Sequence, residues 1–243
     1  MANRAYLGVW LREFSEANLL AHFERFLASA PLSSTSPFTE LVVQAVASSE
    51  TPLAEWDLRG QDFTAADIAQ LAREYVHSDT AFVVGARWDL WVLDPDAGLW
   101  TRAASPLMLL CQGPEYDSGV CAEFGHLHAE LGFEHLFTGH AGVLGSRRAA
   151  VASQEATLLD GAASDSSVVR APAAQSPAEQ AFSAWIAQGQ HLREYHEKTR
   201  ENIEQLFSWM RGVEQALPVE SMRLWSEGEE NFEARLDEIL ALR

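Results

Sequence analysis

The stretch TAFVVGARWDLWVLDPDAGLW, residues 80–100, decides the fold of this chain. Between residues 80 and 94 every second residue is apolar, and these residues are Phe82, Val84, Ala86, Trp88, Leu90 and Val92. Side chains of a β-strand point alternately to opposite faces, so this period of two predicts a long strand with one apolar face. The sequence DPDAG at 94–98 is typical of a hairpin connection, and a second strand is predicted at 99–103. An antiparallel sheet is therefore expected at the centre of the fold.

The segments around this hairpin predict the remaining elements of an α+β fold. Apolar residues recur at helical spacing behind Ser15 and Thr64, and both residues are predicted helix N-caps. The predicted strands are 4–14, 38–48, 53–59, 80–94, 99–103, 106–112 and 121–131, and the predicted helices are 15–30 and 64–77. The order of the first six elements, β-α-β-β-α-β, indicates a ferredoxin-like (split βαβ) antiparallel sheet with a further β extension.

The C-terminal third predicts a long helix followed by a shorter antiparallel helix. Ser176-Pro177-Ala178-Glu179 forms a capping box, so a helix is expected from this point to Pro218. Its apolar residues follow a heptad, which requires a partner helix. A second helix at about 219–242 supplies part of that partner, and the sheet or another subunit supplies the rest. The seam residues expected at such an interface are Leu192, His196, Ile203, Leu206 and Met210.

The chain is strongly acidic, with 17 Lys and Arg against 35 Asp and Glu in 243 residues and a formal net charge of -18. Such a protein repels phosphate backbones and anionic lipid headgroups, so no nucleic-acid or membrane partner is expected. No run approaches the roughly 18 continuous apolar residues that span a bilayer. Composition divides the chain into an α+β sheet domain (1–142), an Ala- and Ser-rich linker or loosely packed segment (143–176) and a helical region (177–243).

The two cysteines indicate the cellular compartment of the protein, and the choice of basic residues indicates the type of organism it comes from. Cys111 and Cys121 both fall in predicted strands and are candidates for a disulfide. Two thiols in a chain of this length are more typical of a reducing compartment, which predicts a cytoplasmic protein. Lys198 is the single lysine among many arginines, and alanine is abundant, which indicates a bacterial source.

The stretch FGHLHAELGFEHLFTGH, residues 124–140, contains the candidate metal-binding side chains. In a strand, the period of two places His126, His128 and Glu130 on one face, with His135 and His140 following. Imidazole and carboxylate groups bind zinc or another divalent metal, and histidine is also a general base near neutral pH. The alternative is that these are polar residues of a sheet face with ordinary hydrogen bonds.

The second face of the predicted sheet combines aromatic and charged residues. Its expected members are Tyr6, Trp10, Arg12, Arg87, Asp89 and Trp91. Aromatic residues and arginine are enriched in interface hot spots, so this face is a candidate surface for a partner. In the alternative interpretation, the C-terminal helices cover it.

The sequence contains no Walker motif, dinucleotide glycine motif, HExxH or nucleophile elbow. It therefore favours a non-catalytic interaction or scaffold module, adaptor-like or immunity-like, with a protein partner or a second copy and no cofactor. The second hypothesis is a metal-dependent enzyme with zinc or another divalent ion at His126, His128 and Glu130. The third is a nucleic-acid mimic, which requires carboxylates along one continuous surface.

Overall fold

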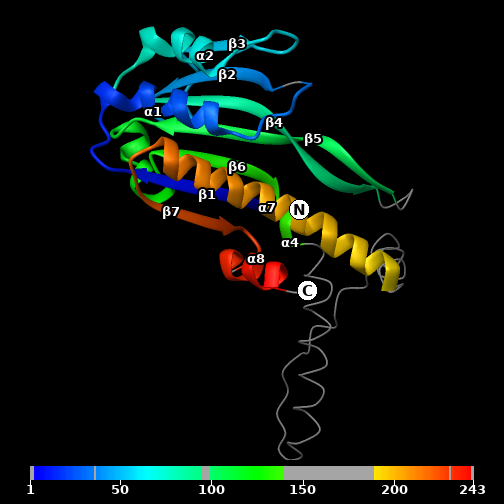
Figure 1. Cartoon of the computed structure of the whole chain (residues 1–243). Helices are drawn as coiled ribbons and strands as arrows, with labels where there is room; N and C mark the ends of the chain where they lie inside the picture. The colour runs from blue at the N-terminus through cyan, green and yellow to red at the C-terminus, as the bar shows by residue number, and fades with distance from the viewer. Residues whose placement is uncertain (1–2, 36, 95–98, 139–188, 230, 242–243) are drawn as a thin grey trace, which may run out of the picture.

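The computed structural model describes residues 3–35, 37–94, 99–138, 189–229 and 231–241, which form an α+β fold around a seven-stranded sheet (Figure 1). The strands are β1 (Arg4–Leu11), β2 (Phe38–Ala45), β3 (Ala54–Asp57), β4 (Thr80–Asp94), β5 (Leu99–Gln112), β6 (Leu127–Phe133) and β7 (Val219–Ser226). The helices are α1 (Glu16–Ser29), α2 (Ala65–Ala72), α3 (Cys121–Phe124), α4 (His135–Thr138), α7 (Gly189–Ala216) and α8 (Phe232–Ala241), with short 3-10 turns η1 (Arg73–Tyr75) and η2 (Tyr116–Ser118).

The central hairpin is built as its sequence pattern predicts. The strand predicted at 80–94 is confirmed as β4 with the same bounds, and its antiparallel partner β5 starts at Leu99. The two short strands predicted after the turn are one continuous strand that runs through Pro106. The predicted N-caps Ser15 and Thr64 are also confirmed, because each precedes a helix in a capping box.

The strands follow the order β3-β2-β4-β5-β6-β1-β7, and every pairing is antiparallel. β1 lies between β6 and β7 and does not pair with β2, β3 or β4. A split βαβ would pair β1 with a strand among the first six elements, so the sheet does not have the predicted ferredoxin-like order. The order of elements along the chain is as predicted, but it does not reveal partners that lie far away in the sequence.

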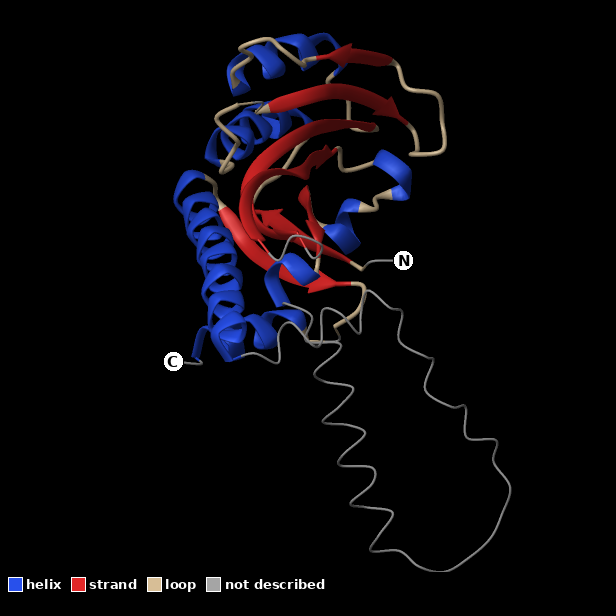
Figure 2. Cartoon of the chain, turned by 90° about the vertical axis from the view of Figure 1, so that its right-hand side faces the viewer, coloured by secondary structure: helices blue, strands red, loops and turns tan. Residues whose placement is uncertain are grey.

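The helices α1, α2 and α7 pack on one face of the curved sheet, and the apolar residues of β4 point toward them (Figure 2). The Trp88 ring of β4 lies 6.1 Å from the Trp209 ring of α7, which in turn lies 5.6 Å from the Phe26 ring of α1. Burial of each such side chain stabilises the fold by about 1.5–3 kcal/mol. α7 therefore packs on the apolar face, and of the residues expected on the aromatic and charged face it contacts Trp91. The interpretation in which the C-terminal helices cover that face is wrong for the residues of β1, which lie on the other side of the sheet.

The C-terminal region contributes a strand as well as helices. α7 is the described part of the predicted long helix, while the start of that helix and the predicted linker 143–176 lie outside the described residues. The second predicted helix is wrong over 219–226, because these residues form β7 beside β1. Pro218 cannot continue a helix, and after it Met222 and Leu224 alternate toward the core. No helix in the described ranges is long and apolar enough to cross a membrane.

The predicted strand 121–131 begins later than expected. Residues 121–124 form α3, and β6 begins at Leu127. Gly125 lies between them with a φ of 101°, and a Cβ atom there would be 2.6 Å from the Val9 backbone nitrogen. Glycine is required for this close approach to β1, so the chain turns here before the strand starts.

β4 and β5 continue beyond the rest of the sheet as a two-stranded arm, because β2 pairs with β4 only as far as Ala86. Asn202 of α7 covers the open edge of this arm. Its Oδ1 accepts the Trp91 N–H at 2.8 Å, and its Nδ2 donates to Trp91 O at 3.0 Å and to Leu136 O at 2.9 Å. The buried amide therefore takes the place of a neighbouring strand.

Val46, the residue after β2, has a backbone conformation that is costly for a β-branched side chain. Its φ is 69° and its side chain is exposed. We expect Val46→Gly to raise the free energy of unfolding by about 1 kcal/mol, because the strain of the left-handed conformation exceeds the entropy cost of glycine. Urea unfolding measures the difference. Leu53→Gly is the matched control, since Leu53 is similarly exposed and lacks a positive φ, and it should be destabilising.

Candidate functional site

The concave face is the side of the sheet away from α1, α2 and α7 (Figure 2). Described residues cover one half of it, and the other half, called the open half below, has no described residue over it. The cover is the segment 113–125, which contains η2 and α3. Tyr116 O–H of the cover donates to Gln44 Oε1 at 2.9 Å, and Trp10 Nε1–H of the sheet donates to Ala122 O at 3.3 Å. These bonds hold the cover against β1 and β2, away from the open half of the face.

Four rings meet where the cover reaches β1, β6 and β7, and this group, called the ring cluster below, consists of Tyr6, Phe124, His128 and Trp225. His128 is at its centre, with its ring 5.6 Å from Tyr6, 6.0 Å from Phe124 and 5.5 Å from Trp225. The Nε2 atom of His128 is buried and has no hydrogen-bond partner among the described residues. Burial lowers the pKa of His128 to about 4, so the ring is neutral at pH 7.

A hydrogen bond at the margin of the ring cluster ties β1 to the end of β7. Tyr6 O–H donates to Glu227 Oε1 at 2.6 Å, and the backbone N–H of Arg4 donates to Glu227 Oε2 at 3.1 Å. Burial, and then the bond to Glu227, raise the pKa of Tyr6 to about 12. The bond from Tyr6 also lowers the pKa of Glu227. The phenol is therefore a firm hydrogen-bond donor at neutral pH and holds the two strands together.

The three residues of the predicted metal site are held apart by other partners. His126 precedes β6, its Nδ1 accepts the Leu11 N–H at 2.9 Å, and its ring stacks on Phe14 at 4.3 Å. His128 lies in the ring cluster, and Glu130 pairs with Arg4. The part of the chain that the structure describes contains no group of three His, Cys, Asp or Glu residues able to hold a metal ion.

The remaining metal-binding and thiol candidates are placed as follows. The His135 ring stacks on Phe133, and His140 lies outside the described residues. Cys111 and Cys121 are both free and buried. Cys111 Sγ faces the Leu19 carbonyl of α1, whereas Cys121 belongs to the cover on the other side of the sheet.

A cleft of about 170 Å³ lies on the open half of the concave face. Gly85 is at its floor, and a Cβ there would be 2.5 Å from Thr39 Oγ1, so the absence of a side chain keeps the cleft open. Its walls are the aliphatic side chains of Pro106 and Met108 and four charged residues of both signs: Arg4, Glu40, Arg87 and Glu130. The side chain of Arg87 is exposed and donates to the Ala104 carbonyl at 3.0 Å.

The aromatic and basic residues predicted for the interface lie in two places, the concave face and the contact between the arm and α7. Tyr6 and Trp10 are half-buried on the concave face near the cover, and Arg12 and Arg87 are exposed. Trp91 instead belongs to the contact between the arm and α7, where Lys198 Nζ lies 3.7 Å from the indole centroid. Its Nε1–H donates to Glu201, so this indole is engaged within the chain.

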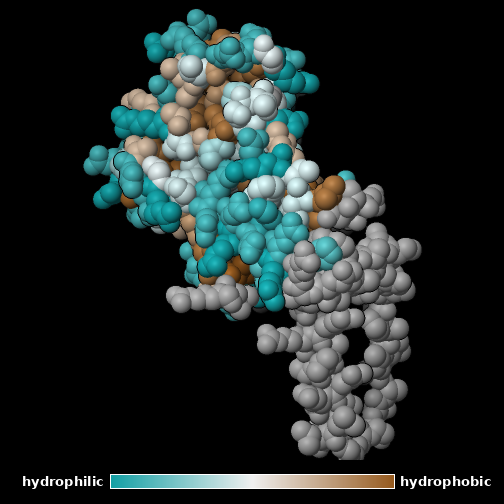
Figure 3. Space-filling view, turned by 45° about the vertical axis from the view of Figure 1, so that its right-hand side comes forward, coloured by the Kyte–Doolittle hydropathy of each residue, from teal (hydrophilic) through white to brown (hydrophobic). Residues whose placement is uncertain are grey.

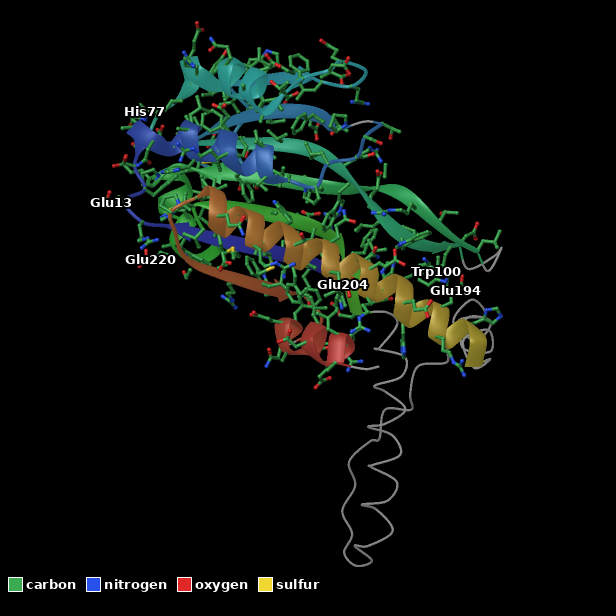
Figure 4. The ribbon with its side chains drawn as sticks, in the orientation of Figure 1. Glu13, His77, Trp100, Glu194, Glu204 and Glu220 are labelled. Atoms are coloured by element: carbon green, nitrogen blue, oxygen red, sulfur yellow. The ribbon has the colours of Figure 1, made fainter. Side chains whose placement is uncertain are left out.

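The predicted seam of α7 is used largely inside the molecule. Ile203 and Leu206 are fully buried against the sheet, and Met210 is half-buried beside them. His196 is exposed, and the side chain of Leu192 is not among those that the structure describes. Nearer the start of the helix, the Tyr195 ring lies 5.3 Å from Trp100 at the end of the arm (Figure 4).

Sequence reasoning missed the contribution of β7 to the concave face. Trp225 stacks on Tyr6 at 5.6 Å, and the guanidinium of Arg223 lies 5.4 Å from the Trp225 ring centroid. The alternation in VESMRLWS, residues 219–226, is the signal that could have revealed this strand. No family model, characterised protein or solved structure matches the chain.

Proposed function

We propose that this chain is a cytoplasmic bacterial interaction module that binds a protein partner through the open half of the concave face. The supporting observation is the asymmetry of the sheet. Helices pack against the apolar face, whereas among the described residues the segment 113–125 covers only half of the opposite face. The uncovered half presents arginine, glutamate and aliphatic side chains around the cleft.

The dimensions and chemistry of the cleft favour a protein over a small molecule. Ligand pockets generally hold roughly 300–1,000 Å³, and this cleft is smaller. Charged side chains of both signs, such as Arg87 and Glu40, suit a polar rim around a few apolar contacts such as Pro106. A single side chain from a partner would occupy the cleft while its neighbours meet the charged rim.

Site-specific photo-crosslinking in the native cell tests this function. We expect a photoreactive residue at the exposed position Pro106 to give one discrete adduct with a protein, and the same residue at Gln215, exposed on α7, to give none. Arg87→Glu should reduce the Pro106 adduct at least fivefold, because an arginine at an interface rim steers and pairs with the partner. The mass of the adduct distinguishes a foreign protein from a second copy.

Equal adducts at the two positions, or no adduct at Pro106, would contradict the proposal. An Arg87→Glu variant that crosslinks as well as the parent would show that the partner contacts another part of the molecule. The folded state of each variant is checked by its urea unfolding curve, so loss of the adduct is not confused with loss of the fold.

A further inference from the structure

The helical side of the molecule has a second hollow, separate from the cleft on the concave face. This groove, of about 380 Å³, lies between the C-terminal half of α1, the loop that leads into β2 and the N-terminal end of α2. Its volume is within the range typical of ligand pockets. Its walls are mostly apolar, with the side chains of Leu27, Leu32, Phe38 and Phe63. Hydrophobic residues are seen among hydrophilic ones in the upper part of the molecule in Figure 3.

Small residues keep this groove open. Ala28 of α1 and Ala65 and Ala66 of α2 lie around it, and Ala28 and Ala66 are exposed. α1 and α2 pack against each other elsewhere along their lengths. At this end, the short side chains leave a space that larger residues would fill. An apolar side chain from outside would therefore gain burial here without displacing any part of the described chain.

Glu24 is the one charged residue among the described residues that line this groove. It is half-buried on α1, and its carboxylate makes no hydrogen bond or ion pair with any described residue. Another half-buried carboxylate, Glu130, is paired with Arg4. A ligand that places an apolar side chain in the groove and a cationic group next to it would form an ion pair with this carboxylate. Glu24 is thus placed to select the charge of whatever occupies the groove.

The net charge of -18 favours the same class of occupant, because a strongly acidic protein attracts basic partners and repels acidic ones. We infer that the groove binds a bulky apolar side chain of a partner protein that is followed by a lysine or arginine, with Glu24 pairing with the basic group. This surface is on the opposite side of the sheet from the proposed concave-face interface, so the two inferences stand or fall separately.

NMR spectroscopy of the full chain with labelled alanine methyl groups tests this recognition. The probes are two dipeptides of opposite charge, N-acetyl-tryptophanyl-arginine amide and N-acetyl-tryptophanyl-glutamate amide. We expect the arginine dipeptide to shift the methyl signals of Ala28 and Ala66, with that of Ala216 on α7 unchanged. It should bind about fivefold more tightly than the glutamate dipeptide, as an exposed ion pair allows.

Two variants make the test specific. Glu24→Gln should reduce the preference for the arginine dipeptide to less than twofold, and Ala28→Trp should abolish binding of both probes by filling the groove. Ala28→Ser is the matched control at the same exposed position and should bind as the parent does. Unshifted Ala28 and Ala66 signals, equal binding of the two dipeptides by the parent, or an unchanged preference in Glu24→Gln would each overturn the inference.

Discussion

Replacement of His128 by phenylalanine should remove most of the loss of folding stability that occurs on acidification. Burial lowers the pKa of His128 to about 4 from its ordinary value of 6.5. Between these two values the unfolded chain binds a proton that the folded chain excludes, so the free energy of unfolding falls as the pH falls. This difference corresponds to about 3 kcal/mol in total, of which about 2 kcal/mol is lost between pH 7 and pH 5.

Phenylalanine keeps an aromatic ring in the ring cluster and removes the buried Nε2 atom that has no partner among the described residues. The variant should therefore be at least as stable as the parent at pH 7 and about 2 kcal/mol more stable at pH 5. Burial also lowers the pKa values of His22 and His126, so a smaller acid sensitivity of the same sign should persist.

Urea unfolding at pH 7 and pH 5 measures this effect. His77→Asn is the control, because His77 is exposed and its hydrogen bond with Asp79 raises its pKa, which is the opposite direction. That variant should lose as much stability on acidification as the parent does, or slightly more. A His128→Phe variant that loses stability in parallel with the parent would show that His128 is not the group that responds to pH.

Asn202→Leu should destabilise the fold strongly. It leaves the Trp91 N–H, the Trp91 carbonyl and the Leu136 carbonyl without their partners at a buried position. Each unsatisfied buried group costs about 1–3 kcal/mol, and we expect a total loss of about 4 kcal/mol in the free energy of unfolding.

The control for this substitution is Ser208→Leu, at an exposed position on the same helix. It introduces the same side chain and should change the free energy of unfolding by less than about 0.5 kcal/mol. Hydrogen exchange adds a local measurement, since the Trp91 amide should exchange much faster in Asn202→Leu than in the parent. A small loss of stability together with an unchanged Trp91 exchange rate would refute the role of Asn202 as a substitute strand.

Elements with a local signal could be predicted from the sequence. The alternation around Trp88 predicts β4, and Ser15 and Thr64 predict the starts of α1 and α2, because the periodicity and the capping bonds involve near neighbours. The partners of β1 could not be predicted in this way. The pairing of β1 depends on strands that are far away in the sequence, and the residue pattern within β1 does not indicate which of them will be its neighbours.

The concave face was predicted in part for the same reason. Tyr6, Trp10 and His128 follow from the period of two in their own strands. Trp225 falls within the helix predicted at 219–242, because its spacing of three from Met222 fits one face of a helix, whereas in β7 the two side chains point to opposite faces of the sheet. His126 shares the phase of His128 along the chain, but its ring bonds the Leu11 N–H, an interaction that no spacing reveals.

The position of β1 between β6 and β7 has a consequence for synthesis on the ribosome. The bond between the Arg4 N–H and Glu227 joins residues that are 223 positions apart. At about 5–20 residues per second, the first strand waits roughly 10–45 s for its last neighbour to be translated. One edge of the nascent sheet stays unpaired during that interval, the state in which chains aggregate most readily. The nascent chain is thus most exposed to aggregation just before β7 is translated.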